Sequence, residues 1–202
     1  MRRAALTSKG RVEWAAYDRL AASLLEPLDA KQRERLVAAM GEVERLLRAS
    51  AVDIVFESPP SADARWCLDC YFRELAERFE SGFDSAEDPS APEEELTPPA
   101  GRFVVARLKS EPVGCGALKR VDETTGEIKR VWTAPSARGL VVARRVLQKL
   151  EAAAREASLT ILRLDTNRAL NEAHALYRKE GYREIERFND NPYAHHWFEK
   201  WL

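Results

Sequence analysis

The sequence predicts an α+β fold: a mixed, mostly antiparallel sheet flanked by helices and preceded by an αα-hairpin. Two observations predict it. Apolar residues recur at helical spacing through residues 1–50, whereas from residue 51 onward short alternating segments take turns with helical ones. The elements after residue 50 follow the order β-α-β-β-β-α-β-α-β-β, which is typical of one sheet with helices on both faces.

The composition is that of a globular protein with no strong charge bias. A net charge of −1 gives no reason to expect binding to nucleic acid or to a membrane surface. No apolar run approaches the ~20 residues of a membrane span, and the N-terminus lacks the apolar segment of a secretory signal. Three cysteines are an odd, sparse count that favours a reducing compartment, so we expect a cytoplasmic protein. Cys67 and Cys70 form an isolated CxxC without a second ligand pair, so no metal site is predicted.

Residues 1–50 are predicted to form two helices. The apolar stripe of the first comprises Trp14, Tyr17, Leu20 and Leu24, and that of the second comprises Leu36, Met40, Val43 and Leu47. Asp29 and Gln32 have the spacing of a capping box at the start of the second helix. So short a segment cannot bury both stripes by itself. We therefore expect it to pack on the rest of the protein or on a second copy, and a homodimer through these helices is predicted.

The remaining elements follow in order along the chain. Residues 52–56 alternate like a strand, and a helix follows from residue 61 to about residue 79. Residues 81–100 are Pro-rich, acidic and aperiodic, which predicts a mobile loop that serves as a spacer or as a lid. Later strands are predicted at residues 102–108, 112–119, 127–133, 160–165, 182–186 and 193–201, and helices at about 138–157 and 170–180.

Residues 131–147 read VWTAPSARGLVVARRVL and predict a strand, a tight turn and the start of a basic amphipathic helix. Unpaired backbone N–H groups and the helix dipole converge at such a turn, which favours phosphate binding. Val141 stands where the turn would most favour glycine, because a β-branched residue adopts positive φ with difficulty. If Val141 is already part of the helix, valine is compatible with its backbone. The affinity of the site for a phosphate-bearing cofactor is therefore open.

At this point residues 52–202 resemble the GNAT family of acetyl-CoA-dependent N-acetyltransferases. The resemblance rests on the strand order and on three motifs. These are EIKRVWTAP at residues 127–135, RGLVVA at residues 138–143 against the family pattern Arg/Gln-x-x-Gly-x-Gly/Ala, and NEAHALYRKEGY at residues 171–182. It implies a GNAT fold, acetyl-CoA as cofactor, and direct acetyl transfer, in a ternary complex, to a primary amine of a small molecule or peptide.

The resemblance also implies two catalytic residues. Glu127 matches a glutamate that accepts the proton of the amine, usually through water; the alternative is a solvated glutamate paired with Lys129 or Arg130. Tyr177 matches a tyrosine that protonates the leaving thiolate, and the alternative is an ordinary half-buried aromatic residue.

The cofactor-binding residues are implied in the same way. The backbone N–H of Val131 would polarise the thioester carbonyl, because family members splay the sheet beside this strand. Asn171 matches an asparagine that contacts CoA, and it shares one helix face with His174 and Tyr177. The full set is Val131, Thr133, Arg138, Gly139, Leu140, Val141, Val142, Ala143, Arg144 and Asn171, with Arg145 as a further source of charge.

Recognition of the amine is left open by the sequence. Residues 189–198 are both polar and aromatic, so they line an acceptor pocket or form a hairpin edge. Residues 93–95 are three glutamates that attract a cationic amine or are simply solvated.

Residues 5–50 resemble the C-terminal part of a MarR-type regulator, whose helices build the dimer interface, and fusions of such regulators to GNAT domains exist. The resemblance implies two domains, a helical hairpin at residues 1–50 and an acetyltransferase domain at residues 51–202. The winged helix-turn-helix is absent from this sequence, so DNA binding by this chain alone is not expected. An alternative function is a non-catalytic, CoA-sensing domain of a MarR-type transcriptional regulator.

Overall fold

The computed structural model describes residues 6–80, 82–84 and 92–202, and the chain divides into two compact units, Met1–Leu47 and Arg48–Leu202. Ser8–Leu25 form α1 and Ala30–Ser50 form α2, as predicted. The capping box is present: the Asp29 N–H donates to Gln32 Oε1 (2.9 Å) and the Gln32 N–H donates to Asp29 Oδ1 (2.8 Å).

The apolar stripes of α1 and α2 are exposed in the structure. No described residue of α2 is buried, and Trp14 and Tyr17 of α1 are 66% and 72% exposed. The predicted need for a covering partner therefore stands, and the homodimer stays a prediction. None of the helices within the described ranges is long and apolar enough to cross a membrane.

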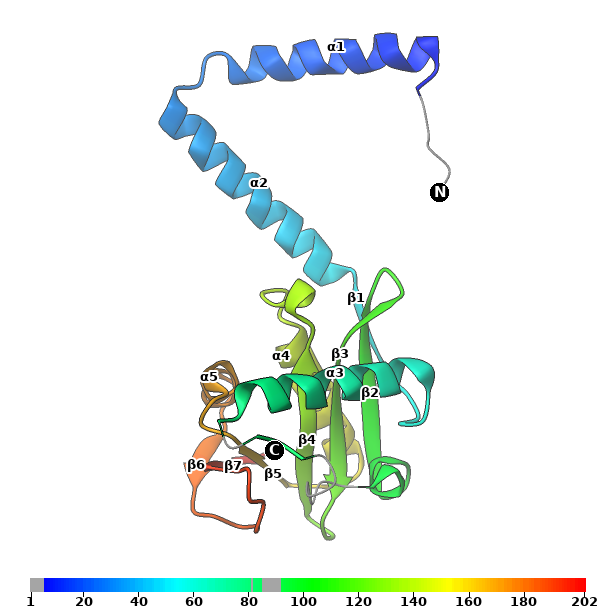
Figure 1. The fold of residues 1–202 in the computed structure, drawn as a ribbon, viewed down its shortest axis with the longest axis vertical. Coiled ribbons are helices and arrows are strands. Elements are labelled where there is room, and N and C mark those ends of the chain that lie inside the picture. Colours follow the sequence, from blue (N-terminus) through cyan, green and yellow to red (C-terminus); the bar gives the residue numbers. More distant parts are fainter. Residues whose placement is uncertain (1–5, 81, 85–91) are drawn as a thin grey trace. The chain divides into compact units, whose positions relative to one another are not determined.

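Seven strands form one sheet in the order β1-β2-β3-β4-β5-β7-β6 (Figure 1). The strands are Val52–Phe56 (β1), Gly101–Leu108 (β2), Glu111–Arg120 (β3), Thr125–Thr133 (β4), Ile161–Thr166 (β5), Arg183–Ile185 (β6) and His196–Trp201 (β7). β4 and β5 run parallel, and every other neighbouring pair is antiparallel. The predicted mixed, mostly antiparallel sheet is confirmed.

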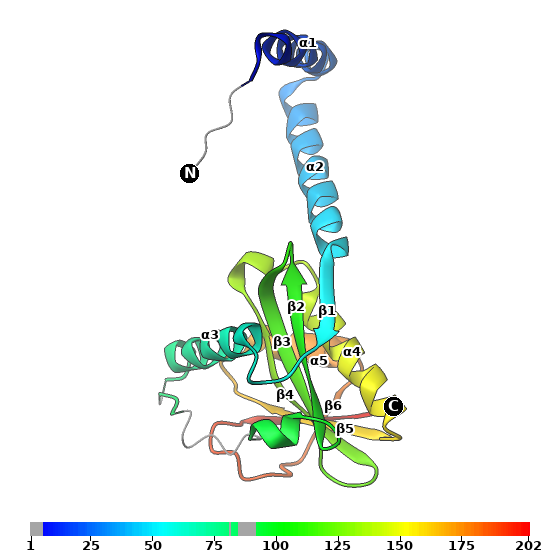
Figure 2. The same ribbon diagram turned by 90° about the vertical axis from the view of Figure 1, so that its right-hand side faces the viewer.

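Helices cover both faces of this sheet. Ala62–Arg78 (α3) lies on one face and Val142–Glu156 (α4) on the opposite one (Figure 2), while Asn171–Lys179 (α5) packs beside β6 and β7. Because both faces are covered, the side chains from Phe103 to Ala106 in β2 are all buried rather than alternating. The core formed in this way fixes the ends of β4, α3 and α5.

Two predicted segments differ in detail. The helix expected from residue 138 begins only at Val142, because Pro135–Ala137 form a short 3₁₀ turn (η2) and Val141 has a left-handed backbone. Residues 81 and 85–91 of the predicted loop lie outside the described residues. Its described end contains the 3₁₀ turn Glu93–Leu96 (η1), in which Leu96 is 1% exposed.

The sheet opens between β4 and β5. Their pairing runs from Thr125 to Glu127, which lies opposite Arg163, and β4 then continues without β5 as far as Thr133. A bulge in the β3–β4 ladder accompanies this separation, with Arg130 at φ +56°. The predicted splay beside Val131 is therefore present, and it makes room for the site described next.

Candidate active site

A groove with a volume of ≈ 460 Å³ lies among α3, the end of β4, the turn before α4, and α5. Its lining includes most of the residues predicted to bind the cofactor, namely Val131, Thr133, Arg138, Gly139, Val141, Val142, Ala143 and Arg144. Two predicted residues do not line it: Leu140 is buried in the core, and Asn171 is exposed at the first position of α5.

The turn before α4 presents backbone donors to this groove. The N–H of Arg145 donates to the carbonyl of Val141 (3.1 Å), so the N–H groups of residues 142–144 precede the hydrogen-bonded ladder of α4. Gly139 and Val141 both have left-handed backbones, at φ +80° and +53°. Valine is therefore not in the right-handed helix at this position, and its conformation costs about 1–2 kcal/mol.

Thr133 supplies a polar group that has no hydrogen-bond partner among the described residues. The Oγ1 atom of Thr133 is buried and makes no hydrogen bond with any described residue. Thr133 also lines the groove. Buried hydroxyl groups are nearly always satisfied, so this atom is suited to a hydrogen bond with a ligand.

Charged side chains cross the wall of the groove on the side of α3. The carboxylate of Glu74 accepts hydrogen bonds from Arg138 Nη2 (2.6 Å), Arg78 Nη1 (3.1 Å) and Trp132 Nε1 (2.9 Å), and Arg78 Nη2 also reaches Glu172 Oε2 (2.8 Å). Burial alone would raise the pKa of Glu74, but these donors outweigh it and the pKa is lowered. The network holds both arginines at the groove.

The two arginines that open α4 point in different directions. Arg144 Nε pairs with Glu180 Oε1 at 2.9 Å and lines the groove. Arg145 Nη1 instead donates to the carbonyl oxygen of Ala49 (2.9 Å) and lines neither cavity described here. Of these two arginines, only Arg144 is therefore placed to meet a phosphate in this groove.

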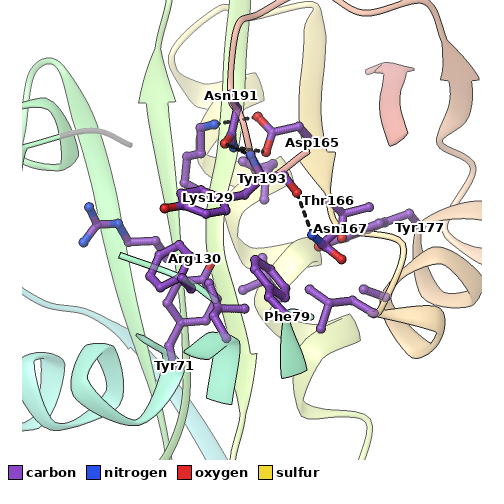
Figure 3. A pocket seen from close by; sticks show the side chains of 16 residues that line it. Tyr71, Phe79, Lys129, Arg130, Asp165, Thr166, Asn167, Tyr177, Asn191 and Tyr193 are labelled. Atoms are coloured by element: carbon purple, nitrogen blue, oxygen red, sulfur yellow. Dashed lines mark hydrogen bonds and ion pairs between the residues drawn. The ribbon is translucent and has the colours of Figure 1, made fainter. Parts of the chain in front are cut away.

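A smaller cavity of ≈ 80 Å³ adjoins the groove (Figure 3). The two cavities share Tyr71, Leu75, Val131, Leu170, Ala173 and Tyr177. Tyr177 thus lies at their junction, and its ring packs on Tyr182 and Phe198. Burial, with the charge of Asp165, raises the pKa of Tyr177 well above its ordinary value, so the phenol keeps its proton at neutral pH.

The polar end of the smaller cavity is built around Lys129. Its Nζ atom contacts Glu127 Oε1 (2.7 Å) and Asp165 Oδ2 (2.9 Å), and the amides of Asn189 and Asn191 donate to Asp165 as well. We call these five residues the Lys129 cluster. Burial alone would lower the pKa of Lys129, but the two carboxylates outweigh it and raise the pKa, so the ammonium stays charged.

Within the Lys129 cluster, Lys129, Asp165 and Asn191 line the smaller cavity, whereas Glu127 and Asn189 line neither cavity. The pairing of Glu127 with Lys129 that the sequence offered as an alternative is present. The role of Glu127 as proton acceptor stays a prediction.

Aromatic rings form the other wall of the smaller cavity. Tyr71, Phe79 and Phe83 come from α3 and the segment after it, and Tyr193 comes from the loop before β7. The rings of Phe83 and Tyr193 are 4.8 Å apart at their centroids. The predicted segment 189–198 therefore divides: Asn191 and Tyr193 line the cavity, while His196 to Phe198 belong to β7.

A family model described as "Acetyltransferase (GNAT) family" matches residues 68–182. This chain belongs to the acetyltransferase (GNAT) family. An IAA acetyltransferase of Azospirillum brasilense is 43% identical to the GNAT chain over 88 residues, which are 43% of this chain and 58% of that protein. The chain spans less than two thirds of the length of the curated relatives that it matches.

Two solved structures illustrate the agreement in fold. An acetyltransferase from Streptococcus agalactiae has a TM-score of 0.61 and 25% identity, covering 75% of this GNAT chain and 99% of that one. A GNAT family acetyltransferase from Elizabethkingia anophelis with acetyl-CoA bound has a TM-score of 0.53 and 17% identity, over 75% and 99% of the two chains. The predicted GNAT fold and family are confirmed.

His174 of this GNAT chain faces the core rather than the groove. It is buried, its Nε2 contacts the carbonyl oxygen of Asn167 (3.0 Å), and its ring lies 4.4 Å from that of His196. The predicted shared face of Asn171, His174 and Tyr177 therefore brings only Tyr177 to the cavities.

The pKa of His174 is lowered by burial and by the charges of His196 and Arg178, against the opposing effects of Asn167 and Glu184. A lowered folded-state pKa means that the unfolded chain binds the proton more readily as the pH falls. The contribution of His174 to the free energy of unfolding should therefore be fully present above about pH 6.5 and should decline as the pH falls below that value. Urea unfolding of His174→Gln at pH 7.5 and 5.5 should show a smaller decline than the native sequence.

The matched control for this measurement is His195→Gln, because His195 is exposed. It should retain the native decline. If the free energy of unfolding of His174→Gln falls between pH 7.5 and 5.5 as much as that of the native protein, the pH dependence does not come from His174.

Sequence reasoning missed the carboxylate that faces the smaller cavity. Asp165 ends the predicted strand at residues 160–165, and a carboxylate near the end of a largely apolar strand was the available signal. Nor did the sequence single out Asn167 or Phe79, which become neighbours only through the packing of α3 on the sheet. Within the described ranges, no group of three or more His, Cys, Asp and Glu side chains is placed to hold a metal ion.

Proposed function

We propose that this protein is an N-acetyltransferase that moves an acetyl group from acetyl-CoA to a primary amine of a small molecule or peptide, by direct transfer in a ternary complex. The observation that carries the proposal is the pair of adjoining cavities with Tyr177 at their junction. A large groove for the acyl donor and a small cavity for the acceptor meet where transfer would occur. The acetyl-CoA bound to the Elizabethkingia anophelis relative supports the choice of donor.

The residues of the groove fit acetyl-CoA, which supplies an activated acetyl thioester when bound. The N–H groups of residues 142–144 and the guanidinium groups of Arg138 and Arg144 suit its phosphates. The unpartnered Thr133 hydroxyl and the backbone of Val131, beyond the β4–β5 ladder, suit its amide and carbonyl groups. Asn171 lies between the groove residues Leu170 and Glu172 and stays a predicted contact of the cofactor. Leu140 is buried, so it would act by holding the turn in place.

Two residues are assigned roles with protons. Tyr177 holds a proton at its phenol oxygen and delivers it to the leaving thiolate. Glu127 is proposed to accept the proton of the amine. Because Glu127 does not line the smaller cavity, the amine proton is proposed to pass first to Asp165, which lines it. Asp165 then gives this proton to Lys129 as the Lys129 ammonium gives one of its own to Glu127, so that Lys129 stays charged and only Glu127 gains a proton.

Calorimetric titration of acetyl-CoA followed by assays of CoA release with a panel of amines tests the proposal. We expect micromolar binding and release that depends on an amine. Binding without turnover on any amine would favour the second candidate, a non-catalytic, CoA-sensing domain of a MarR-type regulator. The strained valine in the turn is the observation that favours that candidate.

The variant Val141→Gly should unfold at a temperature a few degrees higher than the native protein. It removes about 1–2 kcal/mol of left-handed strain, less the ~0.5–1 kcal/mol that glycine loses in chain entropy. It should also bind acetyl-CoA severalfold more tightly, because the exposed side chain of Val141 lines the groove. Thermal unfolding and calorimetry measure the two effects.

Gly139→Ala is the matched control. Gly139 has φ +80°, and an added Cβ would meet no atom within 4 Å, so this variant adds backbone strain alone and should be less stable. A loss of stability in Val141→Gly would contradict the conformation assigned to the turn.

For the N-terminal helices we propose the arrangement that their sequence predicts. They resemble the dimerisation helices of MarR-type regulators, and their exposed stripes support a homodimer. Light scattering should give twice the mass of one chain. A monomeric mass at micromolar concentration would overturn this part of the proposal.

A further inference from the structure

We propose that the acceptor is a small arylalkylamine, whose ammonium group is bound by Asp165 and whose apolar stem lies among the aromatic rings of the smaller cavity. This inference rests on the proposed function. Three observations carry it: a carboxylate at one end of the cavity, aromatic rings at the other, and amide groups that already have hydrogen-bond partners within the protein.

The charge at the polar end favours a cation. The Lys129 cluster holds two carboxylates, Glu127 and Asp165, against the single ammonium of Lys129, so its formal charge is −1. Arg130 does not reverse this, because its guanidinium lies over the ring of Phe72 at 5.1 Å and points away from Asp165 (Figure 3).

Asp165 retains room for one more donor. Its Oδ2 atom accepts hydrogen bonds from Lys129 Nζ (2.9 Å) and Asn189 Nδ2 (2.6 Å), whereas Oδ1 accepts one from Asn191 Nδ2 (2.9 Å). A carboxylate oxygen commonly accepts two. The second site on Oδ1 is therefore suited to a substrate ammonium, in a charge-assisted hydrogen bond.

The aromatic wall suits the carbon stem and the cation together. Tyr71, Phe79, Phe83 and Tyr193 line the cavity, and ring faces attract cations as well as apolar groups. With a volume of ≈ 80 Å³ against ≈ 460 Å³, this cavity is much smaller than the adjoining groove, which fits a small acceptor.

The amides of the cavity are already used, which argues against a polyhydroxylated amine. Asn191 donates to Asp165 and accepts from the Tyr193 N–H (3.0 Å). Asn167 donates to the Tyr193 carbonyl (2.7 Å) and accepts from the Ala169 N–H (2.9 Å). Sugar hydroxyls would find few partners, and each unmade hydrogen bond would weaken binding.

The first test compares acceptors under steady-state conditions with the full chain and saturating acetyl-CoA. We expect kcat/KM for 2-phenylethylamine to exceed that for glucosamine by roughly tenfold or more, since unpaired hydroxyls are costly. In Asp165→Asn, KM for 2-phenylethylamine should rise by about tenfold or more as the charge-assisted contact is lost. The matched control is Asp190→Asn, the same change on a fully exposed neighbour, which should leave KM unchanged.

A binding measurement keeps the inference testable if Asp165→Asn fails to fold. The native protein, alone and saturated with CoA, should bind 2-phenylethylamine roughly tenfold more tightly than its neutral analogue 2-phenylethanol. Tyr193→Leu should weaken binding of the amine by removing one ring of the wall. Equal affinity for amine and alcohol, or a preference for glucosamine, would overturn the inference.

The two proposals fail in different ways. If acetyl-CoA does not bind, or if no amine is acetylated, the proposed function fails, and the comparison of amine with alcohol still decides what the smaller cavity binds. If amines are acetylated but glucosamine or an amino acid is preferred, only the assignment of the acceptor fails.

Discussion

Replacing Tyr177 with phenylalanine should lower kcat by roughly 10² or more, in the range expected for the loss of a general acid. The affinity for acetyl-CoA should change little. The phenol lies at the junction of the two cavities, and it is protonated at neutral pH. Phenylalanine preserves the ring contacts with Tyr182 and Phe198, whose centroids are 5.9 and 5.8 Å away, so the fold should be retained.

The neighbouring Tyr182 provides the matched control. It is also a buried tyrosine, it touches Tyr177, and it lines neither cavity. Steady-state kinetics and calorimetry on Tyr182→Phe should give kcat and Kd close to native values. If Tyr177→Phe loses no more activity than Tyr182→Phe, the hydroxyl of Tyr177 is not the proton donor.

The order of strands and helices was predictable because burial imposes regular periods. The repeat of two in β5, where half-buried and buried residues alternate from Ile161 to Thr166, and the repeat of 3.6 in α4 follow directly from which side chains face the core. The backbone of Val141 was not predictable in the same way. Its φ depends on the 3₁₀ turn Pro135–Ala137 and on Gly139, which together set the direction in which the chain enters α4.

The Lys129 cluster shows where sequence reasoning stops within the site. Glu127 and Lys129 are two residues apart on one strand, so their pairing was foreseen as an alternative. Asp165 joins them from β5 and Asn189 from the loop before β7, and no local pattern specifies these neighbours. Their approach depends on the register of β4 with β5 and of β5 with β7, which only the folded sheet defines.

The N-terminal helices show the same limit at a larger scale. Helical periodicity and the capping box of Asp29 and Gln32 predict where the helices lie. Periodicity also predicts an apolar face, but it carries no information on the surface that covers this face. Trp14 and Met40 are 66% and 60% exposed, and a second chain is one partner that would bury them.

Replacing Lys129 with methionine should have the largest effect on stability. The side chains of Glu127 and Asp165 are only 10% and 8% exposed, and both contact the Lys129 ammonium. Without it, two buried carboxylates remain close together with no cation between them. The expected loss is about 3–5 kcal/mol, as for other broken buried pairs. Urea unfolding at pH 7 measures it.

Two further variants separate this explanation from a simple packing defect. Lys119 lies on the neighbouring strand β3 and pairs with Glu95 of η1. This pair is more exposed, so Lys119→Met should lower the free energy of unfolding by only about 0–1 kcal/mol. Lys129→Met combined with Glu127→Gln removes one of the two opposing carboxylates, and it should recover part of the lost stability. If the double variant is as unstable as the sum of the single ones, the two charges do not interact. The link by which Glu127 is proposed to receive a proton from the acceptor cavity would then be absent.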